Sequence, residues 1–388
     1  MKKLLLALLS VFCIFTANAG QIANVEFIHN AINKNWGLDI EYADALKTPV
    51  AAANMKYLLT TVDVANEILN LKKTTNYGTG PYATTIAVDT AATIQAVDEL
   101  IKFTADDIFI ATVSATDEFT VRLSIAATGT FYIYWGHGKV QEINQTTTSK
   151  KDYSHQYKTP GTYTIRLGGV ATKYNSSASV ATLSFNTNKE LVEVSGSLGK
   201  VFPTLADGSQ PRFYNTFAGC SNLKSVSANL FSGLSGTPTE AMFRRTFYDC
   251  TGLKDVPAGL FDSVSGQPAK NMFSETFANC TQLETIPNGL FARFYGTPID
   301  YMFQKTFYKC TSLKQIPSNL FGNISGSAKS SMFSQTFYDC NSLTGESAKI
   351  NGKYIYEIWP TASTSYIGDM YYNATGLTDY ANIPSNYK

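Results

Sequence analysis

The stretch MFQKTFYKCTSLKQIPSNLF, residues 302–321, decides the fold, because its pattern returns every 30 residues through the second half of the chain. Each copy places a cysteine at the same point, so five cysteines are evenly spaced: Cys220, Cys250, Cys280, Cys310 and Cys340. A fixed period of about 20–50 residues is typical of solenoids, in which each repeat packs on the next. We therefore expect residues 191–388 to form a solenoid with degenerate repeats at its ends.

Within one repeat, the apolar residues change from a helical spacing to an extended one. Phe243, Phe247 and Cys250 follow one another at i, i+4 and i+7, which predicts an apolar stripe on a helix of about three turns. The helix would begin at a capping box, residues 237–240. Residues 253–256 then predict a short strand. One helix and one strand in each repeat predict an α/β solenoid.

The five cysteines have three possible roles. Zinc sites group cysteines in close pairs or with histidine, and the repeats contain no histidine. Disulfides occur in exported proteins, but five equivalent cysteines leave one unpaired. Free thiols that act as small apolar core residues fit best, because a degenerate last unit, residues 371–377, has Ala374 in the cysteine position. We favour this structural role and keep disulfides and metal binding as alternatives.

Composition limits the choice of partners. The chain has 388 residues, a formal net charge of +1 and 16% charged residues, against about 25% in an average protein. It has no basic block and no acidic tail, which argues against nucleic acid or an anionic membrane surface as a partner. No apolar stretch of about 18 residues follows the first segment of the chain, so we expect no membrane span.

The first 19 residues have the pattern of an export signal. Lys2 and Lys3 precede an apolar segment, residues 4–15, and residues 17–19 form an A-x-A cleavage site. We therefore expect bacterial Sec export and a secreted or cell-surface location.

Two further regions are expected before the repeats. Residues 20–105 form a predicted helical region, because apolar residues recur at helical spacing over 51–71 and 87–103. Residues 106–190 change to period-two alternation, for example over 119–125, with Gly, Pro and Asn between the alternating segments. Several short strands of this kind predict an all-β sandwich.

Two phrases in this β-rich region resemble the PKD-like family of extracellular sandwich modules. An aromatic strand runs into Trp135-Gly136-His137-Gly138, where that family has a W-G-D-G-like turn, although His137 replaces the usual Asp. Residues 155–165, HQYKTPGTYTI, follow the family pattern of a hairpin that pairs with this strand. The resemblance implies a spacer or adhesion module. For His137 and His155 we expect turn-stabilising hydrogen bonds, since no third metal ligand is visible nearby.

The repeat itself resembles the BspA-like leucine-rich repeats of bacterial surface proteins. That family has an A-F-x-x-C-x-x-L-x-x-I-x-I-P core, and T-F-x-x-C-x-x-L-x-x-I-P stands in its place at residues 276–287 and 306–317. The 30-residue unit is longer than the usual repeat of the family, and two strand residues before the proline are missing. The resemblance implies surface adhesion or host interaction and names no ligand.

The sequence contains no recognisable catalytic constellation. It lacks a nucleophile elbow, a phosphate-binding loop, an H-E-x-x-H motif and a spaced pair of carboxylates. We expect no enzyme, no cofactor and no metal. The preferred function is recognition or adhesion, with a protein or glycan ligand of possible host origin. The alternative is a structural cell-envelope or matrix component that spaces or self-associates without a specific ligand.

Two rows of side chains are the candidate ligand-binding positions, because solenoids bind through extended faces and exposed tyrosines favour contact with partners. The first, here called the strand row, contains the two variable residues in each predicted strand: Lys224, Ser225, Lys254, Asp255, Glu284, Thr285, Lys314 and Gln315. The second, here called the tyrosine row, lies at the predicted helix ends and contains Tyr248, Tyr308 and Tyr338. For both rows, plain solvated surface is the simpler alternative.

Overall fold

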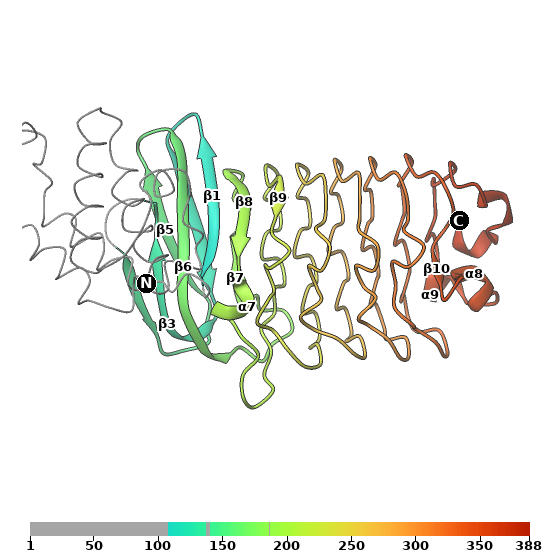
Figure 1. The fold of residues 1–388 in the computed structure, drawn as a ribbon, viewed down its shortest axis with the longest axis horizontal. Coiled ribbons are helices and arrows are strands. Elements are labelled where there is room, and N and C mark those ends of the chain that lie inside the picture. The colour runs from blue at the N-terminus through green and yellow to red at the C-terminus, as the bar shows by residue number, and fades with distance from the viewer. Residues whose placement is uncertain (1–107, 137–139, 186) are drawn as a thin grey trace, which may run out of the picture. The chain divides into compact units, whose positions relative to one another are not determined.

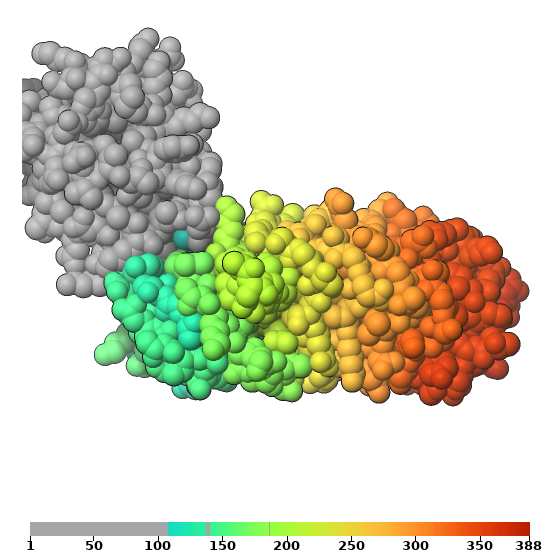
Figure 2. Space-filling view, turned by 90° about the horizontal axis from the view of Figure 1, so that it is seen from below, coloured from blue at the N-terminus to red at the C-terminus, as the bar shows by residue number. Residues whose placement is uncertain are grey.

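The computed structural model describes residues 108–136, 140–185 and 187–388. The export signal of residues 1–19, the helical region expected at residues 20–105 and His137 lie outside these residues. The described part is rich in β-structure, with several sheets and a few short helices (Figure 1). Residues Phe109–Lys388 form one compact unit (Figure 2).

The strands and helices are short and unevenly distributed along the chain. The strands are β1 (Phe109–Ala115), β2 (Phe119–Ile125), β3 (Ala127–Tyr134), β4 (Gln141–Gln145), β5 (Lys151–Tyr157), β6 (Gly161–Tyr174), β7 (Leu183–Ser184), β8 (Leu191–Gly196), β9 (Ser225–Val226), β10 (Lys349–Ile350) and β11 (Lys353–Tyr354). The helices are α7 (Leu198–Val201), α8 (Ile355–Ile358) and α9 (Thr364–Ile367), with 3-10 turns η1 (Tyr380–Asn382) and η2 (Ser385–Tyr387).

Two sheets form the first part of the unit. The larger has the order β4-β3-β6-β1-β8-β9 and the smaller the order β5-β2-β7. Their period-two alternation directs one face inward: along β2, Phe119, Val121 and Leu123 are buried, whereas Thr120 and Arg122 are exposed. Buried residues of both sheets belong to one apolar core. Burying side chains of this size contributes about 1.5–3 kcal/mol each.

The predicted hairpin at residues 155–165 is wrong. β5 pairs with β2, whereas β6 pairs with β1 and β3, so the two strands belong to different sheets. Pro160-Gly161 carries the chain from one sheet to the other, with Gly161 at φ 151°. The pairing of the aromatic strand with this segment is present, because β3 and β6 are antiparallel neighbours.

The larger sheet leads directly into the repeats. β8 is antiparallel to β1 on one side and parallel to β9 of the first repeat on the other, where Val194 lies opposite Val226. The apolar core is continuous across this point. The boundary expected at residue 190 therefore falls inside a shared sheet and a shared core.

From β8 onward, successive coils of the chain lie side by side, so that residues about 30 apart become neighbours (Figure 1). Phenylalanine rings of adjacent coils stack at centroid distances of 5.5, 5.3, 5.6 and 5.5 Å along the column Phe217, Phe247, Phe277, Phe307 and Phe337. Backbone bonds also join the coils: the Phe243 N–H donates to the Met272 carbonyl at 3.0 Å. Ring stacking and backbone hydrogen bonding therefore fix the same register.

The predicted helix of about three turns is wrong. Residues 240–249 form consecutive turns, and the same holds in the next repeats. The backbone passes through positive φ at every fourth residue, at Ala241 (56°), Arg245 (55°) and Asp249 (57°), which a right-handed helix excludes. We call this chain of overlapping four-residue turns, and its equivalents in the other repeats, the turn ribbon.

Hydrogen bonds to the neighbouring coil explain why the turn ribbon replaces the helix. The Arg245 and Asp249 N–H groups donate to carbonyls of the next coil at 3.0 and 2.9 Å, whereas the Thr246 N–H closes a turn on Phe243. The Thr246 hydroxyl also donates to Phe213 O and Phe243 O, both at 2.9 Å. These bonds offset the roughly 1–2 kcal/mol that a non-glycine residue loses in the left-handed region.

The last coil imitates a repeat and closes the core. Tyr371 stacks on Phe337 at 5.8 Å, and Ala374 is fully buried in the cysteine position. The short antiparallel pair β10 and β11 lies beside this coil and precedes α8 and α9 (Figure 1). Tyr387, fully buried, donates its hydroxyl to Trp359 O at 2.9 Å and so fastens the end of the chain to this segment.

Candidate functional site

The strand row lies on parallel backbone segments of adjacent coils. The N–H groups of Glu284, Lys314 and Thr344 donate to the carbonyls 30 residues earlier, the first to Lys254 O at 2.9 Å. Asp255 and Thr285 form a parallel bridge. Of the eight predicted residues, seven are exposed and Glu284 is half-buried. The structure therefore brings the row together as two adjacent columns on one face.

Charges within the strand row partly satisfy one another. Lys314 Nζ pairs with Glu284 Oε2, and the Thr285 hydroxyl donates to Asp255. The hydrogen bond and charge of Lys314 lower the pKa of Glu284. Exposed pairs of this kind contribute little to stability, typically about 0–1 kcal/mol. The column Lys254, Glu284, Lys314 alternates in sign and thus does not present a field of one charge.

The tyrosine row is only partly brought together. Tyr308 and Tyr338 stack at 5.0 Å, and Tyr338 stacks on Tyr372 at 4.6 Å, nearly parallel in both cases. Tyr372, 41% exposed, extends the row and was missed, although aligning residues 371–377 with residues 307–313 puts it at the Tyr308 position. Because the rings cover each other's faces, mainly ring edges and hydroxyls remain for a partner.

Tyr248 lies apart from the other tyrosines. Ala278, only 1% exposed, occupies the coil between it and Tyr308. The Arg245 guanidinium lies 4.7 Å from the Tyr248 ring centroid and donates to Glu275 Oε2 at 2.9 Å from Nε and 2.6 Å from Nη2. A second guanidinium, that of Arg244, lies 3.6 Å from Glu275 Oε1. Tyr248 therefore belongs to a local ion-pair cluster rather than to a continuous aromatic surface.

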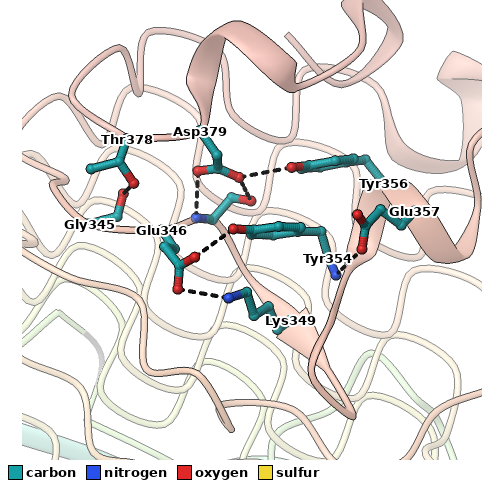
Figure 3. A network of polar contacts seen from close by, with 9 residues as sticks. Gly345, Glu346, Lys349, Tyr354, Tyr356, Glu357, Thr378 and Asp379 are labelled. Atoms are coloured by element: carbon teal, nitrogen blue, oxygen red, sulfur yellow. Dashed lines mark hydrogen bonds and ion pairs between the residues drawn. The ribbon is translucent and has the colours of Figure 1, made fainter.

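A polar network that was not predicted involves Glu346, Lys349 and Tyr354 (Figure 3). Glu346 Oε1 accepts from the Tyr354 hydroxyl at 2.5 Å, and Glu346 Oε2 accepts from Lys349 Nζ at 2.7 Å. The bond to Lys349, then that to Tyr354, lowers the pKa of Glu346. Glu346 in turn raises the pKa of Lys349 and of Tyr354. The carboxylate is thus held charged and oriented.

A buried carboxylate anchors the backbone beneath this network. Asp379, 6% exposed, accepts from the Ser347 N–H at 2.9 Å, the Ser347 hydroxyl at 2.6 Å and the Tyr356 hydroxyl at 3.1 Å (Figure 3). Burial, and next the charge of Asp379, raises the pKa of Tyr356. One sequence signal could have predicted the hairpin of β10 and β11. Asn351-Gly352 is a strong two-residue hairpin turn, and in the structure it joins these strands with φ of 50° and 77°.

A surface depression of about 240 Å³ joins the strand row to this network. Ile316 contributes apolar surface, and its polar lining includes Gln315, Ser318, Thr344, Glu346 and Lys349. Gln315 is the last member of the strand row. The predicted row therefore ends at a concave site in which Gln315 is the only lining residue that belongs to the row.

The five repeat cysteines lie in the core as free thiols. All five are fully buried. The Sγ–H groups of Cys250, Cys280, Cys310 and Cys340 donate to phenylalanine carbonyls 33 residues earlier at 3.1–3.2 Å. Burial raises the pKa of each thiol, that of Cys220 to about 12. Such thiols are poor nucleophiles and poor metal ligands.

The described residues contain no metal-binding cluster of three or more His, Cys, Asp or Glu. The His155 ring stacks on Trp135 at 5.6 Å and meets Tyr157 edge-on at 4.7 Å. His155 thus lies within strand β5 and not in a turn, whereas His137 lies outside the described residues.

No family model and no curated protein matches the sequence. Among the helices that the structure describes, none is both long and apolar enough to cross a membrane.

Proposed function

We propose that this chain is a secreted or cell-surface recognition protein that binds a protein or glycan ligand through the strand row. One observation carries the proposal: eight variable side chains form two adjacent columns over a backbone that repeats from coil to coil. A uniform core beneath a variable outer face is the usual arrangement of binding solenoids. The export signal predicted at residues 1–19 supports display outside the cell.

The same proposal covers the finer fold assignment. We infer a BspA-like leucine-rich-repeat solenoid, because Thr276, Phe277, Cys280 and Leu283 of the shared pattern all point into the core. We also infer a PKD-like module from the pairing of β3 with β6. The turn ribbon, which replaces the expected helices, is a departure from an α/β solenoid. We propose no enzymatic role.

Charge reversal tests the strand row. Replacing Lys224, Lys254 and Lys314 with Glu turns one column uniformly acidic, so binding to an immobilised panel of matrix proteins and glycans should weaken at least tenfold. Surface plasmon resonance with the full chain measures this. A control that reverses three exposed lysines elsewhere, Lys158, Lys270 and Lys329, matches the change in net charge.

The comparison of the two triple variants decides the proposal. Circular dichroism must first show that both retain the wild-type fold. Unchanged affinity in the strand-row variant, or equal loss in both variants, contradicts recognition through this row.

The structural alternative has one observation in its favour. Pairs within the row, Lys314 with Glu284 and Thr285 with Asp255, satisfy polar groups that would otherwise be free for a ligand. A spacer or self-associating component predicts assembly that depends on concentration and needs no ligand. Sedimentation velocity over a hundredfold concentration range distinguishes the two, and assembly without any ligand would rule out adhesion as the primary role.

A further inference from the structure

The depression at the C-terminal end of the strand row combines fixed polar groups with free ones. Glu346 and Lys349 are fixed by each other and by Tyr354, whose hydroxyl donates to Glu346 (Figure 3). Lys349 also lies over the Tyr354 ring at 4.5 Å. By contrast, the Gln315 amide and the Ser318 hydroxyl have no side-chain hydrogen bond among the described residues.

The positions of the fixed groups are set before any ligand arrives. β10 and β11 hold Lys349 opposite Tyr354 in register. Two residues before Lys349, Ser347 is tied through its N–H and its hydroxyl to the buried Asp379. Binding groups fixed in this way lose little conformational entropy when a ligand binds.

The charge of the depression excludes most ligand classes. Glu346 and Lys349 neutralise each other, so neither an anionic nor a cationic ligand finds an uncompensated opposite charge. An apolar ligand would leave the Gln315 and Ser318 polar groups without partners, which is unfavourable for each group that becomes buried. The ligand class that fits the depression is therefore neutral and polar.

The hydrogen-bonding groups of the depression narrow this class further. Gln315 and Ser318 each offer a donor and an acceptor, each Glu346 oxygen keeps a free lone pair, and Lys349 keeps hydrogens beyond its bond to Glu346. A hydroxyl group is itself both donor and acceptor, so a ligand with several hydroxyls matches this mixed set. The volume of about 240 Å³ is below the roughly 300–1,000 Å³ of sites that bury a drug-sized ligand.

We propose that this depression binds one neutral sugar unit of a glycan, with Gln315 and Ser318 as the direct contacts and Glu346 as a pre-oriented acceptor. The inference rests on the proposed recognition function and names a ligand class for one end of the strand row. The remainder of the glycan would extend over the row toward Thr285 and Lys314.

The test uses the full chain, isothermal titration calorimetry and four probes: glucose, galactose, N-acetylglucosamine and glucuronic acid. At least one neutral sugar should bind, and glucuronic acid should bind at least tenfold more weakly. The double variant Gln315→Ser, Ser318→Ala should bind that neutral sugar with at least tenfold lower affinity. Both replacements occur naturally at equivalent positions of other repeats, as Ser225 and Ala258, so the fold should be kept.

Two further variants separate the site from its surroundings. Ser225→Ala, three coils away in the same column, should bind sugar like the wild type. Glu346→Gln leaves the charge of Lys349 uncompensated, so it should weaken neutral-sugar binding and strengthen glucuronic acid binding.

The outcomes distinguish this inference from the proposed function. Absence of sugar binding, or binding that survives in the double variant, overturns the sugar site. A chain that lacks the sugar site can still bind a protein. If reversing the charge of Lys224, Lys254 and Lys314 then abolishes that protein binding, recognition through the strand row stands without the sugar site.

Discussion

Each repeat cysteine places one thiol in the core, and the Sγ–H groups of Cys250, Cys280, Cys310 and Cys340 donate to backbone carbonyls of the preceding coil. The chain itself shows how little else the position demands, because Ala374 fills it in the last coil with no hydrogen-bonding group at all. A thiolate there would be desolvated and close to carbonyl oxygens. The residue acts as a small apolar group that must stay protonated.

The raised thiol pKa values predict how stability depends on pH. Unfolded thiols ionise near pH 9, whereas Cys250, Cys280 and Cys310 keep their protons when folded. Above about pH 9 the unfolded state therefore binds fewer protons, so the free energy of unfolding falls as pH rises, by up to about 1.4 kcal/mol per pH unit for each thiol.

The variant with all three residues replaced by alanine should be less stable at pH 7, because each replacement leaves a small cavity. Its stability should nevertheless decline less steeply than that of the wild type between pH 9 and 11. Urea unfolding at each pH measures both slopes, and parallel slopes would contradict buried, protonated thiols.

At the scale of the element, the turn ribbon depends on residues that tolerate positive φ. The position before each cysteine holds Gly219, Asp249, Asn279, Lys309 and Asp339, all with positive φ. Gly, Asn and Asp are the residues that adopt this conformation most readily. A helix has the opposite preference, since glycine costs about 1 kcal/mol relative to alanine in a helix interior.

Lys309 provides a test, because a turn ribbon and a helix predict opposite orders of stability for its glycine and alanine variants. Both Lys309→Gly and Lys309→Ala lose the contact of Lys309 with the Tyr308 ring, so their difference reports the backbone alone. At φ 56° we expect the glycine variant to be more stable than the alanine variant by about 0.5–1 kcal/mol. Thermal or urea unfolding measures this difference.

Gln304, in the same ribbon but not at positive φ, is the matched control. There the order should reverse, with Gln304→Ala more stable than Gln304→Gly. The same order at both positions would mean that the segment is not a turn ribbon.

The period of the repeats and most of the strands of the first two sheets could be predicted from the sequence, whereas the turn ribbon could not. Phe243, Phe247 and Cys250 fit a helical spacing, yet burial follows a period of four in which Thr246 is buried as fully as Phe247. Over so short a segment, the helical period of 3.6 residues and the observed period of four both place the phenylalanines on the buried side. The residue that distinguishes the turn ribbon from a helix is the recurring threonine. Its hydroxyl bonds a carbonyl of its own coil and a carbonyl of the neighbouring coil, and the second is present only when the coils are stacked.

The strand row could be predicted for a similar reason, and the depression could not. A period fixes which residues share a column, so Lys254, Glu284 and Lys314 could be placed together from spacing alone. The depression joins Gln315 to Glu346 and Lys349, which lie outside the period. Only the packing of β10 and β11 against the last coil brings these residues together.

At the scale of the whole unit, one core runs from the first sheets to the last tyrosine without a gap. Each coil contacts mainly the coils before and after it, so each interface resembles the next one. Phe273 stacks on Phe303 at 5.5 Å and Phe303 on Phe333 at 5.4 Å, with nearly parallel rings. Stability in such arrays is roughly a sum over repeats and their interfaces.

Removing one whole repeat should therefore leave a folded protein. Deleting residues 297–326 brings Phe273 against Phe333 and Asn279 against Asp339, a pairing like that of Asn279 with Asp249. We expect a native circular dichroism spectrum, a lower free energy of unfolding and a urea m-value reduced by about a tenth, because m scales with the surface exposed on unfolding. Deleting residues 297–311 instead shifts every column out of register and should give an unfolded or aggregated chain. If both deletions fold equally well, the 30-residue register is not what holds the unit together; if neither folds, the coils do not form equivalent interfaces.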